Sequence, residues 1–391
     1  MSEARIGRIS NENSTAGPII SGITTFSGQN YFVPPRGTTA ERPSNCPVGS
    51  IRFNTDSAKL EYFDSLQWLE IEAFNVEIGI STAAAPASSG TGHRGLVAGG
   101  NVSPGAADSN NIDYFNISTL GNSLTFGTLS YNPREGSMCS SSTRGVFSGG
   151  YGPAPTLVTN QVFVTISSTG NSTSFGSLSQ ARRLLSAGAN STRGLIAGGG
   201  IGPGGTNVNT IDAITIATTG TNFSFGNLIN TIRDHATFAS PTRCVLGGGS
   251  VPGTNTNRIE YITIATQGNS VSFGSLSAAR TQIGGGSNVT RGLFAGGGEP
   301  GQVNTVEYVT IASTGNTTDF GDLTEGVNQV YNLETSPTRA VRCGGATPSP
   351  GFTNTMDYLT ITSTGNAVDF GDLVRGASKN MAGCSNGHGG L

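Results

Sequence analysis

The stretch TRGLIAGG, Thr192–Gly199, recurs along the chain at a nearly constant spacing. It joins an arginine to a short apolar run and a pair of glycines, which is typical of a buried strand that ends in a tight turn. The other copies are RGLVAGG (94–100), TRGVFSGG (143–150), TRCVLGGG (242–249), TRGLFAGG (290–297) and TRAVRCGG (338–345). Their arginines, Arg94, Arg144, Arg193, Arg243, Arg291 and Arg339, are 48 to 50 residues apart. A period of this length predicts a propeller or a solenoid.

Each period contains four short extended segments separated by Gly, Asn and Pro. In the third copy they are a small-residue stretch (185–190), TRGLIAGG, NTIDAITIATTG (209–220) and NFSFGNL (222–228). The third segment has apolar residues at both parities, which predicts a strand covered on both faces. We therefore expect an all-β fold in which six four-stranded blades form a six-bladed propeller.

The segment GASKNMAGCSNGHGGL (376–391) resembles the start of a further period, and its GHGGL matches GHRGL at 92–96. We expect it to supply the innermost strand of the first blade and so close the ring. A seventh blade is less favoured, because no second, third and fourth strands remain for it.

The order of these segments resembles the kelch repeat. The phenylalanine of each Phe-Gly pair stands where kelch has tryptophan, and the likeness covers about three quarters of the chain. These residues are Phe126, Phe175, Phe225, Phe273, Phe320 and Phe370. The resemblance implies a kelch-like β-propeller over residues 79–391.

Composition excludes several classes of function. The net charge is −3 and only two lysines occur, so no basic face for nucleic acid is expected. No apolar run is long enough for a membrane helix, and five cysteines without CxxC spacing indicate neither a disulfide framework nor a metal site. The three histidines are too dispersed for a metal or triad site, so we expect no metal and no cofactor.

Residues 1–78 lie outside the repeats and form a separate predicted domain. Residues 26–50 are rich in Pro and Gly and predict an extended arm, and residues 49–74 alternate like a β-hairpin or three-stranded meander. The latter stretch, with IRFNT (51–55), Lys59, EYFD (61–64) and Trp68, resembles a segment of structural and tail-fibre proteins of tailed bacteriophages, especially phages of marine cyanobacteria. That resemblance implies a virion component attached through residues 1–78.

The six repeat arginines invite the hypothesis of an anion site. A residue repeated in every blade more often serves the repeat itself, so we expect these arginines to pair with acids on the third strands. The acids are Asp113, Asp212, Glu260, Glu307 and Asp357.

Variable loops follow the Gly-Gly strands and should share one face with the connections between blades. Such a face is a usual place for a binding surface. Tyr131, Tyr151 and Tyr331 fall there with Arg233 nearby, and we predict that these four residues contribute to ligand binding, with the tyrosines as exposed rings that could stack on sugars.

The main functional hypothesis is a non-enzymatic virion protein, assembled in the host cytoplasm, whose propeller is displayed outward. Its expected partners are other virion proteins, through residues 1–78, and a host-surface glycan or receptor, with neither nucleic acid nor membrane insertion. The alternatives are a glycan-degrading, sialidase-like propeller enzyme and a structural decoration protein without a ligand. A homotrimer remains an option for the fibre-like N-terminal part.

Overall fold

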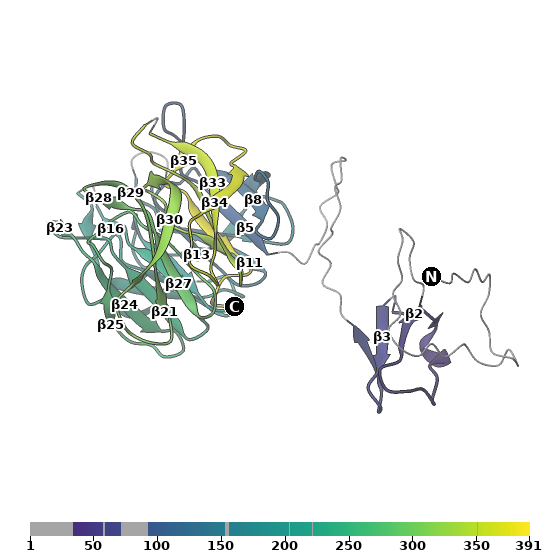
Figure 1. The fold of residues 1–391 in the computed structure, drawn as a ribbon. Coiled ribbons are helices and arrows are strands. Elements are labelled where there is room, and N and C mark those ends of the chain that lie inside the picture. The colour runs from purple at the N-terminus through teal and green to yellow at the C-terminus, as the bar shows by residue number, and fades with distance from the viewer. Residues whose placement is uncertain are drawn as a thin grey trace, which may run out of the picture. The chain divides into compact units, whose positions relative to one another are not determined.

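A computed structural model describes residues 34–57, 59–71, 93–152, 156–202, 204–220, 222–349 and 351–391 (Figure 1). The chain divides into two compact units, Met1–Asn75 and Val76–Leu391. The domain boundary expected between residues 78 and 79 lies outside the described residues, as does most of the predicted arm before Pro34. Within those ranges the protein is all-β, and a 3₁₀ turn is the one helical element.

The first unit is a four-stranded sheet. Its elements are β1 (Arg36–Gly37), the 3₁₀ turn η1 (Thr39–Glu41), β2 (Ile51–Asn54), β3 (Lys59–Phe63) and β4 (Trp68–Ile71). Strands β2, β3 and β4 form an antiparallel meander, as the alternation of the sequence predicts, and β1 runs parallel to β2. The arm between Pro34 and Ser50 therefore adds an edge strand, β1, to the sheet that follows it in the chain.

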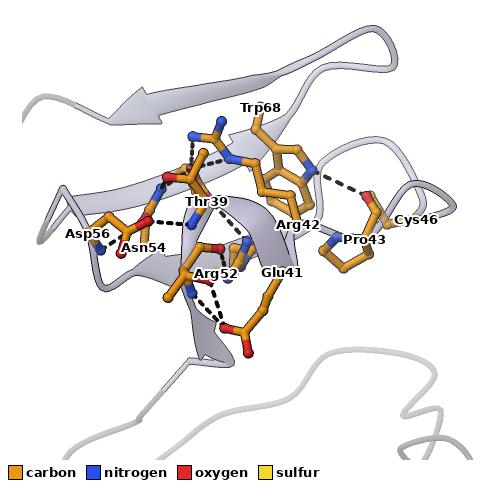
Figure 2. A network of polar contacts seen from close by, with 11 residues as sticks. Thr39, Glu41, Arg42, Pro43, Cys46, Arg52, Asn54, Asp56 and Trp68 are labelled. Carbon is orange, nitrogen blue, oxygen red and sulfur yellow. Dashed lines mark hydrogen bonds and ion pairs between the residues drawn. The ribbon is translucent and has the colours of Figure 1, made fainter.

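A buried polar network joins this arm to the sheet (Figure 2). Glu61 is fully buried, accepts hydrogen bonds from Arg42 Nη2 at 2.6 Å and Asn54 Nδ2 at 3.2 Å, and forms an ion pair with Arg52 at 3.2 Å. The hydrogen bond from Arg42 is the largest cause of the lowered pKa of Glu61. Trp68 Nε1 donates to the Pro43 carbonyl at 3.4 Å. Arg52, Glu61 and Trp68 thus fix the arm in place.

The second unit contains six antiparallel sheets, one for each period of the sequence. The first is β36 (Ala382–Ser385), β5 (Arg94–Ala98), β8 (Asn111–Asn116) and β9 (Leu124–Thr128). The second is β10 (Ser137–Ser140), β11 (Arg144–Ser148), β12 (Asn160–Thr165) and β13 (Thr173–Ser177). The third is β14 (Ser186–Ala189), β15 (Arg193–Ala197), β18 (Thr210–Thr215) and β19 (Phe223–Asn227).

The remaining three sheets repeat this order. The fourth is β20 (Ala236–Ala239), β21 (Arg243–Gly247), β24 (Arg258–Thr263) and β25 (Val271–Ser275). The fifth is β26 (Gly284–Ser287), β27 (Arg291–Ala295), β29 (Gly301–Thr310) and β30 (Thr318–Val327), with β28 (Gly298–Glu299) also paired to β29. The sixth is β31 (Glu334–Thr335), β32 (Arg339–Gly345), β33 (Thr353–Thr360) and β34 (Val368–Asp372).

Short hairpins follow the Gly-Gly strands. They are β6 (Asn101–Val102) with β7 (Ala107–Asp108), β16 (Gly200–Ile201) with β17 (Thr206–Asn207), and β22 (Ser250–Val251) with β23 (Thr254–Asn255). Strand β35 (Ser378–Lys379) pairs with β6. The variable loops of the sequence are the tips of these hairpins and their equivalents.

The C-terminal segment supplies the first strand of the first sheet, as its likeness to the start of a period predicts. Strand β36 pairs with β5, with Ala382 opposite Ala98 and Cys384 opposite Leu96. The first strands of the six sheets also contact one another in cyclic order, β36 to β10, β14, β20, β26, β31 and back to β36. The N-terminal and C-terminal ends of the repeat region therefore meet in one sheet.

The Phe-Gly landmark is where neighbouring sheets touch. Its phenylalanines are buried, and the carbonyl of Phe126 accepts a hydrogen bond from the N–H of Gly170, in the STGN turn of the next sheet, at 3.0 Å. A side chain at Gly127 would place its Cβ only 2.1 Å from the Gly170 carbonyl oxygen. The same bond recurs in all six sheets, including one from Gly121 of the first sheet to Phe370 of the sixth. The glycine of the Phe-Gly pair is therefore required by the packing of one sheet against the next.

Candidate functional site

The six repeat arginines bind backbone, and the expectation that they pair with the third-strand acids is wrong. Arg144 Nη1 donates to the carbonyls of Ile216 and Ala217 in the next sheet, at 3.0 and 2.9 Å, and its guanidinium lies 4.2 Å from the Phe163 ring centroid. Equivalent bonds run from each sheet to the next, and Arg339 returns to the first sheet at Ile117 and Ser118. These arginines hold neighbouring sheets together.

Replacing Arg339 by Met is expected to destabilise the second unit by about 1–3 kcal/mol, because charge-assisted bonds to two carbonyls are lost and no equal donor replaces them. Urea unfolding followed by circular dichroism measures this loss. Tryptophan fluorescence would not follow the second unit, because Trp68, the chain's only tryptophan, lies in the first unit. Arg258→Met, at an exposed position on β24, is the control and should be nearly neutral. Equal losses in the two variants would contradict the interpretation.

Four of the five third-strand acids pair instead with a second set of arginines. These pairs are Arg375–Asp113 at 2.6 Å, Arg182–Asp212 at 2.6 Å, Arg342–Asp357 at 2.8 Å, and Arg280–Glu307. All eight side chains are almost fully buried. The fifth acid, Glu260, accepts hydrogen bonds from the Ser270 hydroxyl and the Ile229 N–H. These carboxylates are committed to holding the sheets and their connections.

A ring of left-handed residues marks the connections between the sheets. One residue per connection has φ between 54° and 60°: Glu135, Leu184, Asp234, Gln282, Gln329 and Asn380. Five hydrogen bonds link neighbouring members of this set through their backbones. They run from the N–H of Leu184 to Glu135 O, Asp234 to Leu184, Gln282 to Asp234, Asn380 to Gln329, and Glu135 to Asn380. Positive φ costs energy at residues other than glycine, so this ring is a fixed feature held by its surroundings. We call these six residues the mouth ring, and the surface around them the mouth.

Most of the charged side chains at the mouth belong to the six residues that immediately precede the members of the mouth ring in the chain. In cyclic order these residues are Lys379, Arg134, Arg183, Arg233, Thr281 and Asn328. Each bridges or pairs with the segment after a Gly-Gly strand, for example Arg233 with Ser250 and Thr281 with Gly298. Four consecutive connections thus present a cation, and we call these four residues the cationic crescent.

Two of the four predicted binding residues, Arg233 and Tyr151, lie beside the mouth ring, although not as expected. Arg233 lines a groove with Gly205, Thr206 and Asn207 of one hairpin and Ser250–Asn255 of the next, and its Nη1 donates to the Gly205 carbonyl at 2.8 Å. The Tyr151 ring has the guanidiniums of Arg134 and Arg183 against it, 4.4 and 4.9 Å from its centroid. Those guanidiniums occupy the surface that a sugar ring would need.

The expectation of an exposed ring is wrong for Tyr331, which is 3% exposed. Its hydroxyl donates to Asp234 Oδ1 at 3.1 Å and lies 3.5 Å from Asn380 Oδ1. Tyr131 is half-buried, packs on Phe147 and donates to the Gly149 carbonyl at 3.0 Å. Both rings support the structure of the mouth from below its surface.

Asp234 is the most perturbed acid of the mouth ring. Burial, partly offset by the Tyr331 hydrogen bond and the charge of Arg233, raises its pKa to about 6. Burial also raises the pKa of Tyr331 well above its usual value, followed by the charges of Asp234 and Glu135. Glu135 itself is paired with Arg183 at 2.7 Å. The charge balance of the mouth therefore changes near neutral pH.

The cavity among the first strands is small. Residues from all six sheets line it, with His388 from the C-terminal tail, and its volume is about 40 Å³, room for only a few water molecules. His388 Nε2 lies 2.8 Å from the Ser140 carbonyl oxygen, and Gly389 N–H donates to Ser287 O at 2.9 Å, so the tail crosses between the second and fifth sheets. His388 of that tail therefore forms part of the cavity wall.

Sequence reasoning did not find Glu135, Asp234 or three members of the cationic crescent. A usable signal was present, since Arg134, Arg183, Arg233 and Thr281 each precede a repeat arginine by ten residues. Among the described residues no group of three or more His, Cys, Asp and Glu is placed to hold a metal ion. Nor does any helix in those parts of the chain have the length and hydropathy to cross a membrane.

Comparison with known proteins assigns no family. No family model matches the chain, and no curated protein is significantly similar to it.

Proposed function

We propose that this protein is a non-enzymatic structural component of a tailed-phage virion, with its second unit a six-bladed kelch-like propeller closed by β36. The propeller interpretation is supported by three sets of cyclic contacts: the first strands, the arginine–carbonyl bonds and the Phe-Gly bonds all return from the sixth sheet to the first. A straight stack of sheets would leave its two ends unpaired.

In this proposal the first unit attaches the chain to the particle and the propeller is displayed to the host. The observation that carries it is the phage-like motif, whose Arg52, Glu61 and Trp68 build a compact unit distinct from the repeats. Six apolar side chains on the opposite face of the meander, Ile51, Phe53, Leu60, Tyr62, Leu69 and Ile71, are at most half-buried, which suits a surface used for attachment.

A glycan-degrading enzyme is the less favoured alternative. Retaining glycosidases need an acid and a nucleophile about 5 Å apart. Four third-strand acids are held in buried ion pairs, and at the mouth Glu135 is held by Arg183. The other alternative is a structural decoration protein without a ligand. The difference in charge between equivalent connections of the mouth, with a cation at four of them and none at Thr281 and Asn328, argues against it.

Quantitative mass spectrometry of gradient-purified particles tests the proposal. We expect the chain in a fixed ratio to the major capsid protein, and we expect particles made with a gene lacking residues 1–75 to assemble without it. The matched control carries Arg258→Thr and should be incorporated normally. Absence of the intact chain from particles, or full incorporation without the first unit, would refute the virion role.

A further inference from the structure

We propose that the cationic crescent and the groove beside Arg233 bind an acidic polysaccharide, through the carboxylates of uronate residues. The inference deepens the adhesion part of the proposed function by naming the ligand class.

The fold does not require a cation at these positions. Thr281 and Asn328 occupy the same place in their connections, make the same backbone bridges as Arg183 and Arg233, and precede residues with the same left-handed φ. By contrast, arginine occurs at all six repeat positions and binds the next sheet each time. The cations at the other four positions are therefore not needed for the backbone geometry and are available to bind a ligand.

Within the described residues, two members of the crescent keep donors that have no hydrogen-bond acceptor. Arg233 Nη1 is bonded and its Nε is buried 3.6 Å from Asp234 Oδ2, so Nη2 is the donor left over, and the side chain is 30% exposed. Lys379 lies 4.5 Å from the Phe352 ring centroid, which supports its stem and ammonium without accepting a hydrogen bond. Arg134 and Arg183 are more occupied, because they pair with Asp108 and Glu135. Arg233 and Lys379 are therefore the expected contacts.

The chemistry of the groove selects the ligand class. A guanidinium is a planar fork that complements a carboxylate, and Thr206, Asn207, Thr254 and Asn255 add hydroxyls and amides suited to sugar hydroxyls. The Tyr151 ring is already covered by guanidiniums, so stacking on it contributes little. Recognition through charge and hydrogen bonds favours an acidic sugar chain over a neutral one.

Calorimetric titration of the purified full chain with an α-1,4-linked galacturonate hexamer tests this inference, with the fully methyl-esterified hexamer as the uncharged probe. We expect only the acidic hexamer to bind. Arg233→Thr and Lys379→Asn should together weaken binding at least tenfold, and both substitutions introduce residues that the fold already accommodates at Thr281 and Asn328. Arg258→Thr, which removes a charge elsewhere, should bind like the parent.

Equal binding of the two hexamers, no binding of the acidic hexamer at millimolar concentration, or an equal loss in Arg258→Thr would overturn the inference. The outcome is independent of particle incorporation. A chain that is present in virions but does not bind galacturonate leaves the structural role intact and removes only the ligand.

Discussion

A chain that ends at Arg375 is expected to lose the cooperative unfolding of its second unit, and at 37 °C to aggregate. The deletion removes β36, whose four residues pair with β5. It strips cover from Leu96, Val97 and Ala98, which are at most 2% exposed in the intact protein. It also opens an unpaired edge in the middle of the structure, a known route to aggregation.

The deleted strand also joins its neighbours on both sides. The Ser140 hydroxyl donates to Ser385 O at 2.7 Å, and the Ser385 hydroxyl donates to Thr335 O, so the loss severs contacts with both the second and the sixth sheets. Full burial of a Leu or Val side chain contributes about 1.5–3 kcal/mol. Losing the cover over Leu96 and Val97 therefore removes a large fraction of the stability of a typical domain, which is about 5–15 kcal/mol.

Differential scanning calorimetry and light scattering measure this effect. The matched control ends at Asn386, which keeps β36 and removes only the tail that crosses the small cavity. We expect the control to fold, with a melting temperature lowered by several degrees. If the longer deletion melted cooperatively as a monomer near the temperature of the intact chain, closure by β36 would not be what holds the first sheet.

The sequence made the strands predictable because each one carries a strong local signal. TRGLIAGG, the Phe-Gly pairs and the STGN turns all follow from strand alternation and turn chemistry. The structure has the four expected strands in each of the six sheets, and short hairpin strands in addition. Residues 376–391 could be placed because they copy the start of a period. These inferences needed only neighbouring residues or the repeat itself.

Side-chain partners were less predictable because they are set across sheets. Arg144 reaches a carbonyl 72 residues further along the chain, and backbone acceptors carry no sequence signal. Tyr331 occupies a connection that looks like a surface loop, yet its hydroxyl meets Asp234, 97 residues away. The cationic crescent was missed for a different reason: it is visible only when the connections, and not the strands, are compared.

Glu334 gives the second large effect, and it appears as a dependence of stability on pH. It occupies the first strand of the sixth sheet opposite Val341, where the equivalent residues of the other sheets are Cys139, Gly188, Phe238, Gly286 and Cys384. It is 1% exposed, and its Oε2 has no hydrogen-bond partner in the part of the chain that the structure describes. Burial raises the pKa of this carboxyl to about 8. Glu334 is therefore mostly protonated at pH 7 in the folded protein.

The sign of the effect follows from comparing the folded and unfolded chains. In the unfolded chain the Glu334 carboxyl titrates near its ordinary pKa of 4.5, well below its value in the folded protein. Its contribution to the free energy of unfolding is fully present below pH 4.5 and is lost as the pH rises to about 8, at up to about 1.4 kcal/mol per pH unit. The intact protein should thus become less stable across this range by several kcal/mol.

Glu334→Gln removes the titration while keeping the shape of the side chain. We expect the two proteins to have similar unfolding free energies at pH 5, and the variant to be the more stable by several kcal/mol at pH 8, because all other titrating groups are shared and cancel in the difference. Urea unfolding at half-unit steps of pH, followed by circular dichroism, gives the two curves. Parallel curves would mean that the carboxylate is stabilised after ionisation, by water or by movement of the adjacent Cys343, whereas curves that separate above pH 5 identify Glu334 as a neutral acid at the junction of the sixth and first sheets.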